Sequence, residues 1–193
     1  MSPKVGPGFD PAHREEVARL FWDAFGAKLR LPLGRTERAV RYIAHTLDPA
    51  HAISATEGGA LLGVAGLKTS QGGLLSGRGS DLTAVYGPLG ALWRGAMLTL
   101  YDRPVEPGAL LMDGLFVAQG ARGRGVGTAL LAAVAERARA EGFAEVRLDV
   151  VDGNRARALY EREGFRPAGR IEAGWLGPLL GFRGATTMRR PMG

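Results

Sequence analysis

Hydrophobic residues recur at helical spacing near the start of the chain. In VARLFWDAF they are three and four residues apart, which predicts a helix over residues 11–29. A second periodic stretch predicts a helix over 36–47. The next segment, HAISATEGGALLGVAGLKTS, holds two apolar runs separated by Glu57-Gly58-Gly59. This pattern predicts two strands joined in a hairpin.

The second half of the chain begins with the strand-like run GALLMDGLFVA. A glycine-rich turn follows, then the helical stretch TALLAAVAERARAEG and the alternating strand EVRLDVV. This order over residues 109–150 predicts a right-handed crossover between two parallel strands. A short helix (NRARALYEREG) and two closing strands (FRPAGRIEA, GATTMRRPM) complete the chain. The predicted fold class is therefore α/β, with a mixed sheet.

Neither an internal repeat nor a domain boundary is evident, so residues 1–193 are predicted to form a single domain. About 40 residues separate the hairpin from the strand near residue 110, which indicates a helical insertion at about 70–106. Within it, the stretch YGPLGALWRGAMLTLYDRPVEPG is apolar on nearly every side. Such a helix is expected to be buried or to be covered by a partner, and a homodimer through the 86–103 helix is one prediction.

Composition narrows the choice of function. The chain has no cysteine and no cluster of metal ligands, so no metal is predicted. The longest apolar stretch, 89–101, is too short to span a bilayer and contains Arg94; a cytoplasmic protein without a membrane partner is expected. The net charge of +6 lacks the basic runs with interleaved aromatic residues that favour nucleic acid, so no nucleic-acid partner is predicted.

The glycine-rich turn is the first candidate site. In ARGRGVGTALL, three glycines alternate with Arg122, Arg124 and Val126 at the predicted start of a helix. A helix N-terminus offers unpaired N–H groups and a partial positive charge, and bare glycine backbone lets a phosphate approach. The spacing matches neither the Walker loop nor the dinucleotide-binding motif. The remaining pattern, Arg-x-x-Gly-x-Gly, indicates a phosphate site, with a purely structural turn as the alternative.

A second motif lies about 27 residues after this turn. The segment NRARALYEREGF begins at Asn154 and contains Tyr160. Together, the two motifs resemble the GNAT superfamily of N-acetyltransferases over residues 110–168. The resemblance implies that acetyl-CoA is the acyl donor and that a primary amine is the acceptor. It also implies a V-shaped splay between strands 110–118 and 145–151, which admits the pantetheine arm.

The resemblance assigns roles to individual residues of the donor site. The backbone of Leu115, Phe116 and Val117 is expected to pair with the pantetheine arm. Asn154 and Tyr160 match positions that contact the cofactor, although Asn154 also suits the cap of the following helix. The pyrophosphate is expected to bind to Arg122, Gly123, Arg124, Gly125, Val126, Gly127 and Thr128.

Two residues are candidates for catalysis. Tyr160 matches the position of a tyrosine that lies near the CoA sulfur in many members, where its phenol can donate to the departing thiolate. The alternative is a packing residue that only binds the cofactor. Asp113 interrupts an apolar strand, and alternation places it on one face with Leu111, Leu115 and Val117. It is expected to meet the acceptor ammonium or to act as a base through water; an internal pair with an arginine is the alternative.

The acceptor itself is not encoded in these motifs. The leading expectation is a small molecule that attacks the thioester directly, in a pocket lined by the insertion, with Tyr86, Trp93 or Trp175 as contributors. A protein or peptide amine, or a module that binds acyl-CoA without turnover, are the alternatives.

Overall fold

A computed structural model describes residues 3–177 and 181–193. Within these residues, the five α-helices are α1 Arg14–Leu33, α2 Thr36–Thr46, α3 Gly79–Thr99, α4 Val126–Ala140 and α5 Ala156–Arg162. The eight strands are β1 Lys4–Pro7, β2 Ala52–Glu57, β3 Ala60–Thr69, β4 Gly72–Gly73, β5 Ala109–Val117, β6 Glu145–Val151, β7 Arg166–Glu172 and β8 Gly184–Pro191. The short 3-10 turns are η1 Pro11–His13, η2 Pro49–His51, η3 Gln119–Ala121 and η4 Gly174–Leu176.

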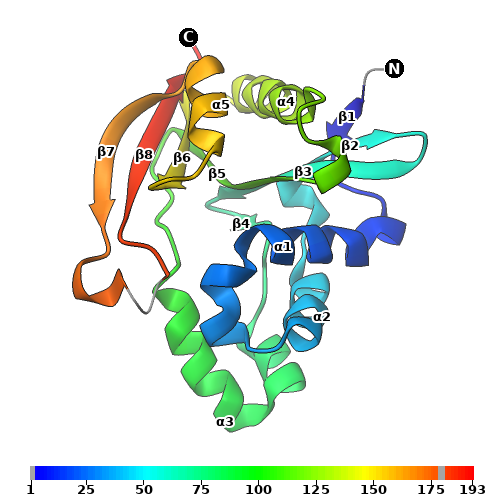
Figure 1. Cartoon of the computed structure of the whole chain (residues 1–193), viewed down its shortest axis with the longest axis vertical. Coiled ribbons are helices and arrows are strands. Elements are labelled where there is room, and N and C mark those ends of the chain that lie inside the picture. Colours follow the sequence, from blue (N-terminus) through cyan, green and yellow to red (C-terminus); the bar gives the residue numbers. More distant parts are fainter. Residues whose placement is uncertain (1–2, 178–180) are drawn as a thin grey trace.

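The strands form one mixed sheet in the order β1-β2-β3-β5-β6-β8-β7, with β4 paired to β3 (Figure 1). Only β5 and β6 run parallel; the other pairs are antiparallel. The predicted hairpin, crossover helix and closing strands are confirmed. β1 was not predicted, because its four residues, KVGP, contain a proline and a glycine and only one large apolar side chain.

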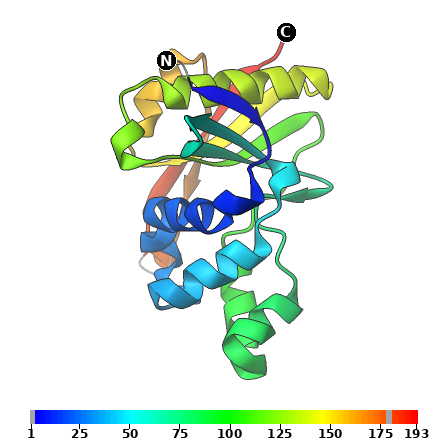
Figure 2. The same cartoon turned by 90° about the vertical axis from the view of Figure 1, so that its right-hand side faces the viewer.

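Helices cover both faces of the sheet. Figures 1 and 2 show α4 and α5 over one face, α1 and α2 over the other, and α3 farther out on the same side as α2. Each face buries its own apolar cluster: Leu130 and Val134 of α4 pack with β-strand residues on one side, and Val17 and Ile43 of α1 and α2 on the other. The burial of these side chains is the main favourable contribution to folding.

β5 and β6 separate partway along their length. They pair only at Ala109–Leu111 with Glu145–Arg147. Beyond Leu111, β5 stays with β3 and β6 stays with β8, so the predicted V-shaped splay is confirmed. A β-bulge lies at the point of separation: Gly114 faces Gly66 and Met112 faces Leu67, which leaves Asp113 as the extra residue. A bulge bends its strand, and this one turns β5 away from β6.

The bulge also corrects the predicted alternation. Leu110 and Met112, before the bulge, pack with the α4 cluster, and so do Leu115 and Val117 after it. Leu111 and Asp113 therefore do not share a face with Leu115 and Val117. The extra residue reverses the side-chain direction after Asp113.

The insertion holds α3, which is kinked at Gly87 (φ 72°, ψ 168°) and continues from Pro88. Only Leu82 and Ala91 of this helix are buried, so burial within the chain, the first of the two predicted alternatives, is wrong, and cover by a partner stays a prediction. Leu89 and Leu92 are 84% and 76% exposed.

Candidate active site

A cleft of about 2110 Å³ opens where β5 and β6 separate. One part is lined by the ends of β5 and β6, the glycine-rich turn and α5. The other part is lined by α1, the end of α3 and the segment before β8. The splay therefore joins the predicted donor site to a second recess.

The glycine-rich turn is open where a phosphate would bind. Gly123 (φ 75°) and Gly125 (φ 78°) adopt the left-handed conformation, which strains any residue with a side chain, and a Cβ added at either would meet nothing within 4 Å. In the described part of the chain, the N–H groups of Val126, Gly127 and Thr128 donate no hydrogen bond. This first turn of α4 is therefore available to an anion.

The side chains of this turn divide into two groups. Arg122 lines the cleft and donates from Nε to the Val117 carbonyl at 3.3 Å. Arg124 is turned toward the hairpin, where it pairs with Glu57. The Val126 side chain is buried in the core, so only its backbone can face a ligand.

Gly127 allows α4 and α5 to pack closely. A Cβ at this position would lie 2.8 Å from Cδ2 of Leu159 in α5. The glycine thus brings the N-terminus of α4 close to the helix that carries Tyr160.

The free edge of β5 faces the cleft beyond the bulge. Leu115, Phe116 and Val117 all line it, and their strand partners are in β3 alone. The Phe116 ring packs against Phe21 and Phe25, so this residue presents its backbone rather than its side chain to a ligand.

Tyr160 lines the cleft from α5 and is only 6% exposed. Its ring packs edge-on against Phe165, with 5.9 Å between the centroids. Burial raises the pKa of Tyr160 to about 12, against the opposing effect of the positive charge of Arg103. The phenol is therefore a protonated hydrogen-bond donor throughout the physiological range.

Asn154 precedes α5 and also lines the cleft. Its Oδ1 accepts a hydrogen bond from the Ala156 N–H at 2.9 Å. The capping contact expected as its alternative role is present, and it leaves the amide NH2 group available for a ligand.

Asp113 makes the internal ion pair with an arginine that was predicted as the alternative to a catalytic role; the partner, Arg103, was not identified from the sequence. Arg103, which follows α3, donates to Oδ1 of Asp113 at 2.5 Å and to its carbonyl at 3.1 Å. The other amino group of Arg103 lies 3.3 Å from Asp149, whose side chain is 4% exposed. Asp113 remains 33% exposed and lines the cleft, so the internal pair does not bury it.

This pair is the end of a longer ion-pair network. It runs from Asp113 through Arg103, Asp149, Arg147, Glu106 and Arg189 to Glu145. Thr187 also donates to Asp149, at 2.7 Å. The network ties the segment after α3 to β5, β6 and β8, and thus fixes the insertion relative to the bulge. The signal in the sequence was EVRLDVV, where Arg147 and Asp149 occupy one face of a central strand.

The three aromatic residues suggested for the acceptor pocket do not line the cleft. Tyr86 donates its hydroxyl hydrogen bond to the Leu33 carbonyl at 2.8 Å, Trp93 stacks on Arg94, and Trp175 is 88% exposed. The insertion contributes instead through the end of α3 and the following segment, which includes Leu98 and Tyr101.

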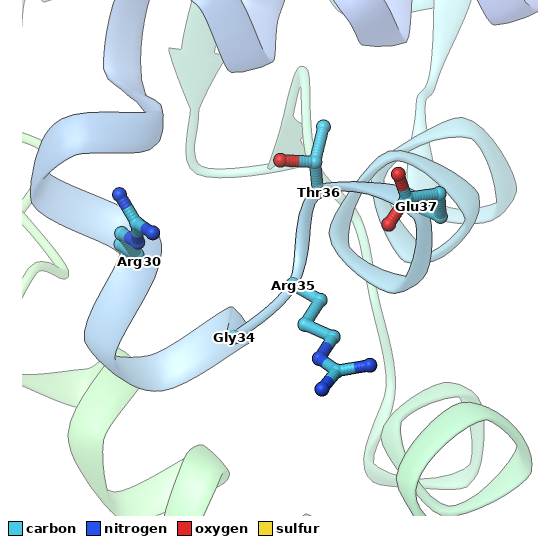
Figure 3. A pocket seen from close by; sticks show the side chains of 5 residues that line it. All are labelled: Arg30, Gly34, Arg35, Thr36 and Glu37. Carbon is cyan, nitrogen blue, oxygen red and sulfur yellow. The ribbon is translucent and has the colours of Figure 1, made fainter.

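A second, smaller pocket of about 360 Å³ lies at the turn between α1 and α2. Figure 3 shows Arg30, Arg35, Thr36 and Glu37 around it, with Arg35 and Thr36 pointing in opposite directions. Because these polar groups do not converge on a common point, this pocket is not the candidate site.

Within residues 3–177 and 181–193, no group of three or more His, Asp or Glu side chains is arranged to hold a metal ion. None of the helices there has both the length and the apolar character needed to cross a membrane.

The splayed parallel strands, the open phosphate turn and the tyrosine beside them define an acyl-CoA-dependent acetyltransferase fold. The sequence profile described as Acetyltransferase (GNAT) family matches residues 14–165, and the chain belongs to this family. A comparison with curated protein sequences found no match.

Solved structures share the fold over nearly the whole chain. One described as an acetyltransferase is 19% identical, with a TM-score of 0.65, and the alignment covers 98% of this chain and 100% of that one. A GCN5-related N-acetyltransferase from Kribbella flavida is 21% identical, with a TM-score of 0.64 and 98% coverage of both chains. A ribosomal-protein-alanine N-acetyltransferase from Brucella melitensis is 18% identical, with a TM-score of 0.63 and coverage of 97% and 99%. At these identities the likeness establishes the fold and not the acceptor.

Proposed function

We propose that this protein moves the acetyl group of acetyl-CoA to a primary amine of a small-molecule acceptor. The observation that carries the proposal is the position of the open first turn of α4 beside the splay, with Tyr160 and Asp113 lining the same cleft. The N–H groups from Gly123 to Thr128, with Arg122, hold the pyrophosphate in this proposal. The free edge of β5 at 115–117 pairs with the pantetheine arm, and Asn154 adds a contact.

The reaction is a direct attack on the thioester. The amine nitrogen forms a bond to the carbonyl carbon and the carbon–sulfur bond breaks, giving an N-acetyl product and CoA. The amine loses one proton and the thiolate gains one. Asp113 receives the amine proton, directly or through water, and Tyr160 donates a hydrogen bond to the developing thiolate.

Release of CoA in an amine screen, with the acetylated product detected by mass spectrometry, tests this function. Turnover with a small amine supports the proposal. Tight binding of acetyl-CoA without turnover of any amine, including peptide amines, would favour the non-catalytic alternative. Turnover restricted to peptide amines would favour a protein acceptor. A single-domain organisation over residues 1–193 and a cytoplasmic location remain predictions from the sequence.

Replacement of Asp113 by Asn is expected to lower kcat/KM for the amine by roughly 100-fold, since a neutral amide takes no proton. The Kd for acetyl-CoA should stay unchanged, because the proposed phosphate contacts come from Arg122 and the first turn of α4 and not from Asp113. Glu145→Gln is the matched control, since it removes a carboxylate from the far end of the same network, outside the cleft lining. Equal losses in the two variants would assign Asp113 to structure alone.

The predicted homodimer through the 86–103 helix has its own test. Leu89→Lys combined with Leu92→Lys places charge on the exposed side of α3 and is expected to convert a dimer to a monomer in analytical ultracentrifugation. Trp175→Lys, on the equally exposed η4, should leave the oligomeric state unchanged. A wild-type protein that sediments as a monomer at micromolar concentration would show the dimer prediction to be wrong.

A further inference from the structure

Lys28 of α1 differs from the other half-buried cations of the cleft. Lys68 pairs with Asp102, Arg103 with Asp113 and Asp149, and Arg147 with Asp149 and Glu106. Arg78, Arg122 and Arg155 also line the cleft without an ion pair in the described residues, but they are exposed.

Lys28 forms no ion pair within residues 3–177 and 181–193, and the five remaining residues include no Asp or Glu. The Lys28 side chain makes a cation–π interaction with Phe182, with Nζ 5.5 Å from the centre of the ring. Burial lowers the pKa of Lys28, and the positive charge of Arg103 lowers it further. An anion beside Nζ would favour the charged ammonium and so oppose both effects on the pKa.

The position of Lys28 is at the acceptor end of the cleft. The Phe25 ring lies against Gly114 at the bulge, where a Cβ would come within 2.8 Å of its Cζ. Lys28 is three residues later on α1, and therefore on the same face of the helix. The Tyr101 hydroxyl donates to the Lys28 carbonyl at 2.9 Å, which anchors this turn to the end of the insertion. The proposed phosphate and pantetheine contacts come from other elements, namely β5, α4 and α5.

We propose that the acceptor carries a carboxylate as well as its amine, and that Lys28 binds this carboxylate while the amine faces Asp113. The inference rests on the proposed function and specifies its substrate class: amino-acid-type acceptors. Both terminal amino groups of Arg103 are already held by Asp113 and Asp149, so Arg103 does not compete for the anion.

The residues around Lys28 also indicate the chemistry of the rest of the acceptor. Phe25, Leu29, Leu98 and Phe182 line the same recess, so the carboxylate and the amine are flanked by apolar walls. An amino acid with an apolar side chain matches this arrangement of one cation, one carboxylate and several hydrophobic surfaces.

The test compares α-amino acids with their carboxamides, which keep the amine but lack the carboxylate. Acetyl transfer to α-amino acids and to their carboxamides is measured as CoA release for the wild type, Lys28→Met and Lys28→Arg. The wild type is expected to favour carboxylates, and Lys28→Met should lose roughly 10- to 100-fold in kcat/KM for them, the usual effect of one charge-assisted hydrogen bond. The carboxamides should react equally with both proteins, and Lys28→Arg should retain part of the preference. A general packing defect would lower both classes together.

Binding of N-acetyl-L-phenylalanine and its amide to the CoA-loaded protein, measured by calorimetry, gives a readout without turnover. Tighter binding of the carboxylate that is lost in Lys28→Met supports the proposal. Equal binding of the two, no binding of the carboxylate at millimolar concentration, or a preference that survives in Lys28→Met would overturn it. CoA release with another small amine of the screen would still be seen in that case if the acetyltransferase proposal is correct, so the two failures are distinguishable.

Discussion

Acetyl-CoA binding is expected to be lost when Gly125 is replaced by Glu. The new carboxylate would lie at the N-terminus of α4, where the N–H groups of its first turn donate no other hydrogen bond in the described residues. It would repel the pyrophosphate and compete for those donors, and it would force a residue with a side chain into a left-handed conformation (φ 78°). Calorimetric titration should show Kd raised by roughly 100-fold or more, which corresponds to about 2.8 kcal/mol.

Gly142→Glu is the matched control for this variant. Gly142 follows the other end of α4, has nearly the same φ (77°) and, like Gly125, would place its Cβ in open space. The two variants therefore suffer similar backbone strain, but only Gly125 adjoins the proposed phosphate site. Thermal unfolding checks that both fold. Unchanged affinity in Gly125→Glu would remove the glycine turn from the donor site.

The parts of the fold that could be predicted from the sequence are those that depend on local patterns. Gly58 and Gly59 lie at the predicted hairpin, and both adopt the positive φ that its tight turn requires. Gly142, also at positive φ, follows the last turn of α4 as a glycine helix stop should. Such signals depend on a few neighbouring residues, and tertiary contacts did not override them.

The features that were missed depend on contacts between distant segments. Arg103 contacts Asp113 and Asp149 because the segment after α3 folds back toward β5 and β6. Nothing near Arg103 in the sequence indicates this. Lys28 acquires its environment from Phe182, which follows more than 150 residues later. The bulge at Asp113 reflects strand register against β3, which alternation along one strand does not reveal.

These misses change how the insertion is interpreted. Sequence reasoning assigned its contribution to large aromatic residues on the apolar stripe, yet Trp93 is packed on Arg94 outside the cleft lining. The contribution comes from the segment after α3, where Asp102 pairs with Lys68 and Arg103 pairs with Asp113 at the bulge. The insertion thus fixes the geometry of charges at the proposed acceptor end of the cleft, while the glycine turn and β5 line the proposed donor end.

Tyr160→Phe is expected to lower kcat by roughly 100-fold while the Kd of acetyl-CoA changes little. Phenylalanine keeps the ring contact with Phe165 but removes the one donor that Tyr160 presents to the cleft. With a pKa of about 12, the phenol stays protonated far above the ordinary thiol value of about 8.5, so its contribution is a hydrogen bond to the developing thiolate rather than complete proton transfer. Single-turnover CoA release measures this chemical step.

The pH profile tests the protonation state of the phenol. Because burial raises the pKa of Tyr160 above its ordinary value of 10, ionisation of the phenol should not lower the wild-type rate below about pH 11. The wild-type and Tyr160→Phe rates should therefore differ by a constant factor between pH 7 and pH 10. Tyr86→Phe, which removes a phenol outside the cleft lining, should cost about 1 kcal/mol of stability and leave kcat unchanged. A Tyr160→Phe enzyme with wild-type kcat would restrict Tyr160 to packing, because the hydroxyl is the only group that the substitution removes.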